Sequence, residues 1–256
     1  MLFRSIRPGS VNVLAVRVAG KFYDINGPHM GPFVIGEMQR LQRNLLAKEF
    51  FDAFFTVIYV VVGVYFMMLF FKQRDEREYL FFSLFSLSTG TYLFLRTQIK
   101  YFITENFVML KRTEYLLVFL IFFFFMEFLT FHFEKKHTPW HYIYPALALL
   151  CMPVIIFSDD IVLWHKVLNY VIQPAWAIPV TFYFWVLIKE FRRDSDAKYM
   201  LGSLFILLLT MLNDVMVHRG VYHFVRVSQY GYLFLVIGVA TIMRNRYVTL
   251  SRAFEE

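Results

Sequence analysis

The sequence predicts an all-α integral membrane protein: a bundle of seven transmembrane helices preceded by a short extracellular β segment. Of the 256 residues, 59% are hydrophobic and 20% aromatic, whereas only 18% are charged. Soluble domains average about 45–50% apolar and about 25% charged residues, so a soluble domain of this length cannot bury so much apolar surface. A single cysteine, Cys151, excludes an intrachain disulfide and with it a disulfide-stapled secreted module.

The net charge of +7 is compatible in principle with nucleic acid binding. The basic residues, however, lie in short connections between long apolar runs instead of along one solvated face. This distribution favours the anionic leaflet of a lipid bilayer as the partner and predicts no nucleic acid.

Residues 1–36 are predicted to be the remnant of an extracellular β domain. Residues 11–18 alternate around Val13, Ala15 and Arg17, and two Gly-Pro pairs punctuate residues 27–32. One or two strands are not stable alone in water, so we expect the cut end of a larger domain. No secretory signal opens the chain, and we therefore expect Met1 to be an introduced start.

Residues 37–52 are predicted to form a short amphipathic helix at the outer membrane surface. Met38, Leu41 and Leu45 share one helical face there. This segment would lead into the first membrane crossing.

Residues 53–243 are predicted to form the bundle, because about 20 apolar residues in a helix cross the hydrocarbon core of a bilayer. The second crossing is diluted by serine and threonine, the fourth is interrupted by proline, and the seventh is near the short limit for a membrane span. In the second, Ser83, Ser86 and Gly90 recur at helical spacing and predict a close-packing face. The predicted crossings are residues 53–71, 79–95, 115–133, 142–158, 167–188, 199–217 and 227–243.

Lys and Arg are more numerous in the connections on the side of the C-terminus than in those on the opposite side. The positive-inside rule then places the N-terminal region outside the cell and the C-terminus in the cytoplasm.

Polar residues inside the predicted crossings form the candidate ligand-binding set: Glu127, Gln173, Asn213 and Asp214. Glu127 lies deepest, and Asp214 lies near the outer end of the sixth crossing. One interpretation is a proton-linked or ligand-responsive cluster, since ionisable groups in lipid are costly and face the bundle interior. The alternative is interhelical hydrogen bonding that fixes packing, at about 1 kcal/mol per contact.

Three functional classes each require residues that this sequence does not provide. A zinc hydrolase needs three or four convergent ligands, but Asp214 and His218 fall on the opposite side from His137 and His141. No Lys lies within the seven crossings to hold retinal, and the last crossing has no proline of the kind that marks eukaryotic G-protein-coupled receptors. We therefore predict no metal, no cofactor and no catalytic residue, with any enzymatic domain outside this chain.

The C-terminal residues 244–256 are predicted to continue the last helix into the cytoplasm. Met243, Tyr247, Leu250 and Phe254 are spaced four, three and four residues apart, which is a heptad rhythm. This pattern fits the start of a signalling coiled coil in a homodimer and equally a basic amphipathic helix on the leaflet. The candidate signal-output residues are Tyr247, Leu250, Phe254, Arg244 and Arg246.

The order of PGSVNVLAVRV, GPFVIG, KQRDEREYLFFSLF and RNRYVTLSRAFEE around the crossings resembles the bacterial seven-transmembrane receptors with diverse intracellular signalling modules. The resemblance implies an extracellular carbohydrate-binding-like jelly roll whose closing strand looks like residues 12–18 here. It also implies a location in the bacterial inner membrane and a cytoplasmic output domain after the bundle, such as a histidine kinase or a diguanylate cyclase. On this resemblance, we expect the given sequence to hold only the end of the jelly roll and none of the output domain.

The functional hypothesis is therefore the membrane core of a sensory receptor, in which an outer carbohydrate or other small molecule shifts the helices and the last helix moves. The alternative is a small proton- or solute-coupled transporter or channel with Glu127 and Asp214 on a polar path. Internal repeats accompany such transporters, and the first and last three crossings show no self-similarity.

Overall fold

The computed structural model of the chain describes residues 38–133, 139–191, 195–218, 221 and 227–255. All regular structure within these ranges is helical, which confirms the all-α fold class. The predicted β remnant, residues 1–36, lies outside the described residues.

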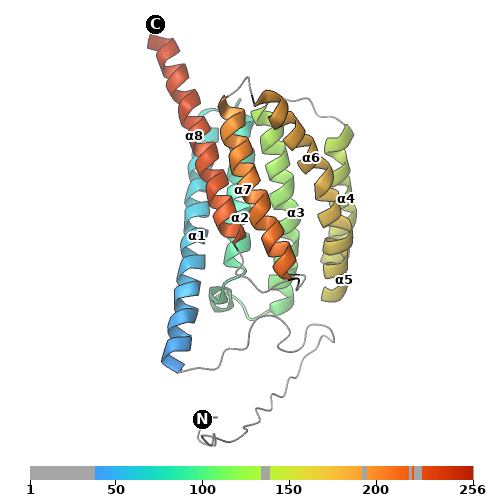
Figure 1. Ribbon diagram of the computed structural model, residues 1–256. Helices are drawn as coiled ribbons and strands as arrows, with labels where there is room; N and C mark the ends of the chain where they lie inside the picture. The colour runs from blue at the N-terminus through green and yellow to red at the C-terminus, as the bar shows by residue number, and fades with distance from the viewer. Residues whose placement is uncertain (1–37, 134–138, 192–194, 219–220, 222–226, 256) are drawn as a thin grey trace, which may run out of the picture. The chain divides into compact units, whose positions relative to one another are not determined.

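The described helices form seven rods, one at each predicted crossing (Figure 1). A 3-10 turn, η1 (Gln98–Phe102), follows the second rod, and the fifth rod is continuous through a single π-helical turn, η2 (Leu168–Ile172). The other elements are α1 (Met38–Lys72), α2 (Arg77–Phe94), α3 (Phe107–His132), α4 (Pro139–Phe157), α5 (Ile161–Val167), α6 (Gln173–Glu190), α7 (Ser195–His218) and α8 (Ser228–Glu255).

By length and composition, four of the described rods are apolar enough to cross a membrane. The apolar parts of α4 and α8, His141–Phe157 and Ser228–Met243, are shorter. The four candidate spans are Leu45–Lys72, Phe107–His132, Ile161–Lys189 and Asp196–Val217.

The first and last rods are both longer than the predicted crossings. α1 runs unbroken from Met38 to Lys72, so the segment predicted as a separate amphipathic helix is the first part of α1. No proline interrupts this stretch, and nothing in its sequence ends the helix at residue 52. α8 continues to Glu255, which confirms the predicted helical extension beyond the last crossing.

Two helices begin earlier than predicted because a capping residue lies upstream of each predicted crossing. The Asn106 side chain accepts a hydrogen bond from the Met109 amide at 3.0 Å, so α3 starts at Phe107 and not at residue 115. Asp160 accepts from the amides of Val162 and Leu163 and starts α5. Asn and Asp are preferred at this position because their side chains satisfy amides that lack intrahelical partners.

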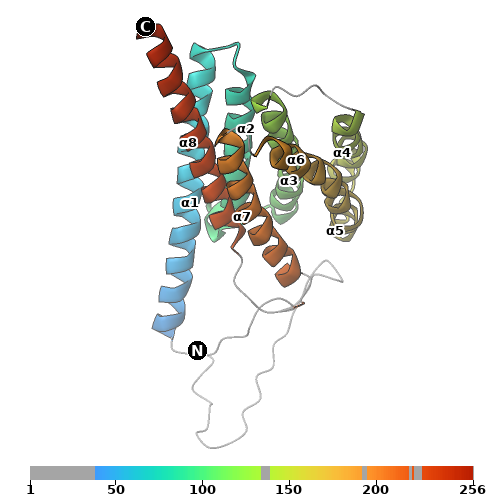
Figure 2. The ribbon, with the colours of Figure 1, turned by 45° about the horizontal axis from the view of Figure 1, so that its top comes forward.

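The rods α1, α2 and α3 pack side by side in chain order, and α7 and α8 form an antiparallel pair. α4 contacts α3 and α6, and α6 contacts α7. Both ribbon views show α8 beside α7 and along α1 (Figures 1 and 2). We call the end of the bundle that holds η1 and the start of α8 the Gln98 end, and the opposite end, where α1 ends and α2 begins, the Lys72 end.

The predicted small-residue face of α2 is confirmed against α1. Ser83 and Ser86 are fully buried, and the Ser83 hydroxyl donates to the Gly63 carbonyl oxygen at 2.7 Å. A Cβ on Gly90 would lie only 3.1 Å from the Cγ2 atom of Val60. Small side chains therefore let α1 and α2 approach closely, as in other membrane helix pairs.

A second close approach joins α7 to α8. A Cβ on Gly238 would meet the Ser203 side chain, and a Cβ on Gly231 would meet Thr210 and lie 3.0 Å from the Cα atom of Leu207. The two glycines are seven residues apart, as are Ser203 and Thr210, so one contact repeats two turns along the pair. We call these four residues the α7–α8 seam.

Candidate functional site

The start of α8 is held by the end of α7. The Asp214 carboxylate accepts hydrogen bonds from the amides of Val227 at 2.7 Å and Ser228 at 3.3 Å. The Asn213 side chain donates to the same carboxylate at 3.1 Å. A carboxylate at this position satisfies free amides and interacts favourably with the positive end of the helix dipole. The structure thus brings two of the predicted ligand-binding residues together at the α7–α8 junction.

α1 contacts the same turn of α8. The buried Tyr59 hydroxyl donates to the Gln229 carbonyl oxygen at 2.8 Å, and the Gln229 side chain is hydrogen-bonded to Asp52. Phe55 meets Tyr230 edge to face, with ring centroids 5.2 Å apart. The first turn of α8 is therefore bonded to both α1 and α7.

Arg96, just beyond α2, lies among acids from three other helices. Its guanidinium carbon lies 5.6 Å from the centre of the Tyr92 ring. Burial alone would lower the pKa of Arg96, but Tyr92 and the carboxylates of Glu114, Asp214 and Asp52 outweigh burial and raise it. One cation thus links α2 electrostatically to α3, α7 and α1.

The rim of the Gln98 end carries more exposed polar contacts. Lys111 pairs with Glu114 at 2.7 Å, and the Gln98 amide donates to Glu49 at 2.8 Å. Lys100 donates to a backbone oxygen, and burial, followed by the nearby Lys111, lowers its pKa.

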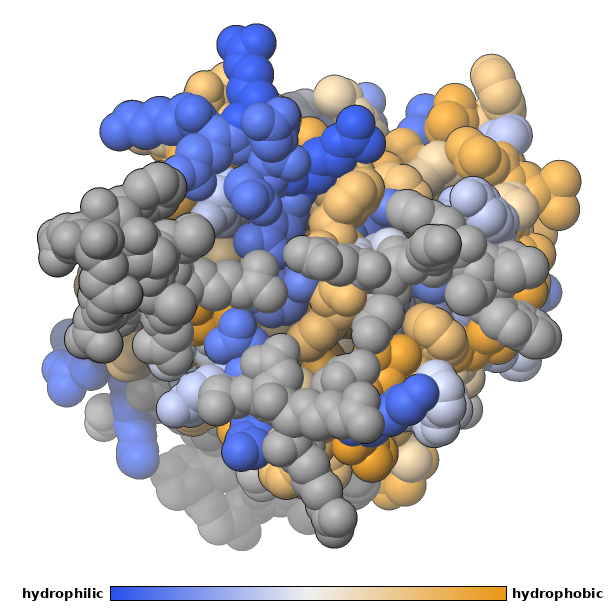
Figure 3. Space-filling model, turned by 90° about the horizontal axis from the view of Figure 1, so that it is seen from above, coloured by the Kyte–Doolittle hydropathy of each residue, from blue (hydrophilic) through white to orange (hydrophobic). Residues whose placement is uncertain are grey.

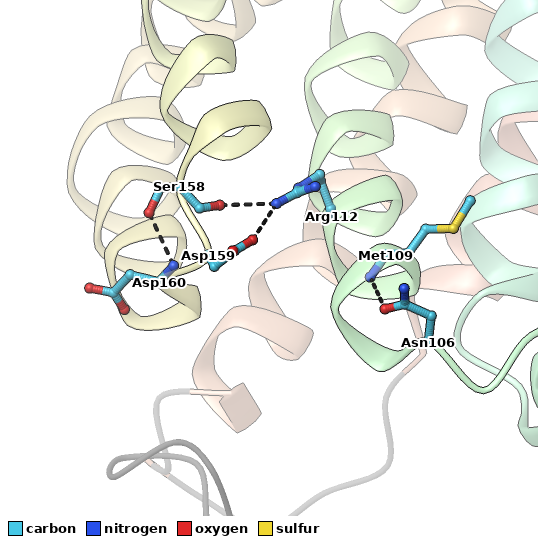
Figure 4. A network of polar contacts seen from close by, with 6 residues as sticks. All are labelled: Asn106, Met109, Arg112, Ser158, Asp159 and Asp160. Atoms are coloured by element: carbon cyan, nitrogen blue, oxygen red, sulfur yellow. Dashed lines mark hydrogen bonds and ion pairs between the residues drawn. The ribbon is translucent and has the colours of Figure 1, made fainter.

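Figure 4 shows a further rim contact, in which Arg112 on α3 reaches the connection between α4 and α5. Its guanidinium lies 2.7 Å from the Asp159 carboxylate and 3.2 Å from the Ser158 carbonyl oxygen. Asp159 is largely exposed, and exposed pairs of this kind contribute about 0–1 kcal/mol. It links α3 to the connection between α4 and α5.

Near the Lys72 end, a buried pair joins α2 to α3. The Nδ1 atom of His132 lies 2.8 Å from the Glu78 carboxylate, and the two side chains are 0% and 5% exposed. Glu78 is in the first turn of α2 and His132 in the last turn of α3, the helix ends at which acidic and basic side chains, respectively, are favoured. The sequence alone did not predict this pair, because Glu78 falls in the connection before the predicted second crossing.

A second buried contact near the Lys72 end joins α3, α4 and α6. The Nε2 atom of His141 lies 2.8 Å from the Tyr183 hydroxyl, which also contacts the Thr130 hydroxyl. The same hydroxyl lies 3.3 Å from the Met126 carbonyl oxygen. One tyrosine therefore connects three rods.

The four predicted ligand-binding residues do not form one cluster. Half-buried Glu127 interacts electrostatically with Tyr183 and lies five residues before the end of α3, whereas Asp214 lies four residues before the end of α7. α3 and α7 run in opposite directions, so these acids lie towards opposite ends of the bundle. Gln173 is the half-buried first residue of α6, partway along the fifth rod.

The predicted signal-output residues Tyr247, Leu250, Phe254, Arg244 and Arg246 all lie on α8. Their side chains are outside the described part of the structure, so the heptad contacts remain a prediction. Among the described residues, no three His, Cys, Asp or Glu side chains lie close enough together to hold a metal ion.

These features define the class of protein: a multi-pass α-helical membrane protein whose last rod is bonded at its start to α1 and α7. The family described as 7TM diverse intracellular signalling matches residues 48–246, most of the chain. The chain belongs to this family of membrane signalling receptor domains, which confirms the resemblance seen in the sequence. No curated protein and no solved structure matches the chain significantly.

Proposed function

We propose that this chain is the signal-transducing membrane core of a bacterial sensory receptor. In this proposal seven crossings lie in the inner membrane, the Gln98 end faces outward, and α8 carries the signal to a cytoplasmic output module. The observation that supports it best is α8 itself. It is an unbroken helix of 28 residues, about 42 Å at 1.5 Å per residue, whose first turn is bonded to α7 and α1.

The proposed orientation rests on the connections between the rods, where Lys and Arg are more numerous at the Lys72 end than at the Gln98 end. Figure 3, viewed from the Lys72 end, shows hydrophilic side chains gathered over part of this face beside hydrophobic ones. At this end the last residue of α1, Lys72, the first residue of α2, Arg77, and Arg74 between them are all exposed. Basic residues are enriched on the cytoplasmic side of membrane proteins.

The input step is a rearrangement around Arg96. A change in the outer domain, or a small molecule such as a carbohydrate, favours one distribution of this cation among Asp52, Glu114 and Asp214. Because Asp214 also accepts hydrogen bonds from the first amides of α8, a shift of Arg96 towards or away from Asp214 changes how firmly the start of α8 is bound. Such a switch needs two packings a few kcal/mol apart, each biased by the ligand.

The output step is movement of α8 together with α7, because the α7–α8 seam leaves little space between their backbones. Beyond the membrane, Tyr247, Leu250 and Phe254 then pair with a second copy and pass the movement on as a change in coiled-coil register. Arg244 and Arg246 flank these heptad positions at the leaflet surface.

A register series tests the proposal. A diguanylate cyclase domain, active only as a dimer, is joined after Glu256 through linkers of zero to seven added residues, and cyclic dinucleotide formation is measured in membranes. Activity is expected to rise and fall over the seven-residue series and to change when Asp214→Asn is introduced. The control Gly202→Ala, where an added Cβ has no atom within 4 Å, should leave the profile unchanged. Cyclase activity that does not vary with linker length and does not change with Asp214→Asn contradicts the proposal.

Dimerisation is tested by crosslinking in the same fusion. Cys151 is the only cysteine, so Cys151→Ser gives a background for single cysteines. Leu250→Cys should crosslink efficiently and its neighbour Ser251→Cys poorly. Equal or absent crosslinking at both positions excludes the heptad pairing.

The transporter alternative is tested by measuring solute flux in liposomes. Flux that is abolished by Glu127→Gln would favour a transporter instead.

A further inference from the structure

The connection between α2 and α3, residues 95–106, buries a lysine and exposes two large apolar side chains. Lys100 is only 7% exposed, and its ammonium group donates to the Leu95 carbonyl oxygen at 2.6 Å. Phe102 is 91% exposed and Ile103 is 73% exposed. Connections in water normally expose charged groups and cover large apolar side chains where they can.

The depth of η1 is set by a contact with α1. The Gln98 amide donates to the Glu49 carboxylate at 2.8 Å, and Glu49 lies in the first turn or so of the candidate span Leu45–Lys72. That span has 28 residues, about 42 Å of helix, whereas the hydrocarbon core is about 30 Å thick. Its ends therefore extend into the headgroup layers, and η1 lies at the level of one of them.

Both neighbouring rods also expose large apolar side chains at this end. Phe50, next to Glu49 on α1, is 70% exposed, and Met109 in the first turn of α3 is 57% exposed. Within η1, Tyr101 is 39% exposed and lies beside the Lys100 ammonium. Aromatic rings with a polar group are enriched at membrane interfaces, where one part of the side chain is apolar and the other hydrated.

We propose that η1 and Ile103 insert into the interfacial layer of the lipid bilayer as an anchor for the Gln98 end. Phe102 and Ile103 enter between the headgroups, while Lys100 stays turned towards the protein. Lys100 is only four positions after Arg96 in the chain, and it is bonded to the carbonyl group of Leu95. The bilayer surface thus fixes the depth of the cation around which the carboxylates of the Gln98 end gather.

Spin-label accessibility tests the anchor in the full chain. In the Cys151→Ser background, nitroxides are attached to Phe102→Cys and Ile103→Cys, and the protein is reconstituted in phosphatidylcholine vesicles. Glu105→Cys, an exposed polar position in the same connection, is the matched aqueous control, and Val61→Cys, an exposed position within the α1 span, is the lipid control. Collision rates with oxygen and with a water-soluble nickel chelate are measured at each site.

The labels at 102 and 103 are expected to have an oxygen-to-nickel ratio severalfold above that at 105 and below that at 61. A ratio equal to that at 105 places the segment in water and overturns the proposal. Low collision rates with both reagents mean that protein covers the segment, which also overturns it, and a dependence on protein density would then identify a second copy. These variants remove largely exposed side chains, and the outcome does not depend on whether α8 transmits a signal.

Discussion

At the Gln98 end, Arg96 interacts electrostatically with carboxylates from three helices, and the start of α8 is bonded to α7 and α1. Near the Lys72 end, buried contacts join α2, α3, α4 and α6 through Glu78 with His132 and His141 with Tyr183. A cation among several acids has alternative arrangements of similar energy, whereas a buried pair at hydrogen-bond distance is costly to separate. We infer that the buried contacts hold a fixed frame and that the Gln98 end is the part that rearranges.

The largest expected effect on the free energy of unfolding comes from removing one residue of the buried Glu78–His132 pair. His132→Ala leaves Glu78 buried without its imidazole partner, and loss of one member of a buried pair costs about 3–5 kcal/mol. The free energy of unfolding, measured by steric trapping in bicelles, should fall by about this amount. Lys111→Ala, which breaks the partly exposed pair with Glu114, is the control and should cost about 0–1 kcal/mol. Equal losses in the two variants would remove the distinction between the two ends.

The next effect concerns the α7–α8 seam, which we expect to make the two rods move together. Gly231→Ala places a Cβ 3.0 Å from the Leu207 backbone and against Thr210, and overpacking of this kind costs about 1–3 kcal/mol. Gly202→Ala on α7 has open space and should instead stabilise the helix by about 0.5–1 kcal/mol. If Gly231→Ala lowers the free energy of unfolding and Gly202→Ala raises it in the same assay, the close packing of the α7–α8 seam is supported. If both variants change it in the same direction, the result argues against the seam.

The sequence predicted the positions of the seven rods because long apolar runs directly report the cost of placing polar groups in lipid. It also predicted the packing face of Ser83, Ser86 and Gly90, since small residues at helical spacing have few other uses in a membrane helix. The same reasoning applied to Gly231 and Gly238 against Ser203 and Thr210 would have found the α7–α8 seam.

The partners of the polar residues were not predictable in the same way, because they depend on which helices are neighbours and in which direction each runs. His132, for example, pairs with Glu78, 54 residues earlier in the chain and on another helix. The four residues predicted as a cluster, Glu127, Gln173, Asn213 and Asp214, do not lie together, because the directions of their helices place them at different levels of the bundle. Asn106 and Asp160, by contrast, were readable as helix caps from the sequence alone.

A sharper test of the comparison uses two caps of the same chemistry. Asp214→Ala and Asp160→Ala each remove a carboxylate that accepts two amide hydrogen bonds, and each should cost about 0.5–2 kcal/mol of stability. Only Asp214→Ala should also speed amide hydrogen exchange in the first turns of α8 and change the output of the cyclase fusion. If Asp160→Ala alters the output equally, the effect reflects general destabilisation of the bundle.

The smallest expected effect isolates the contact between α1 and α8. Tyr59→Phe keeps the ring packed but removes the hydroxyl that donates to Gln229, and single interhelical hydrogen bonds in membrane proteins average about 0.6 kcal/mol. Stability should therefore change little, while the output of the cyclase fusion shifts because one of the contacts that join α1 to the start of α8 is removed. Tyr183→Phe is the matched control, since it removes a hydroxyl bonded to His141 on α4 and should lower stability without a comparable shift in output. If the two variants shift the output equally, the hold on α8 at the Gln98 end has no special role in transmission.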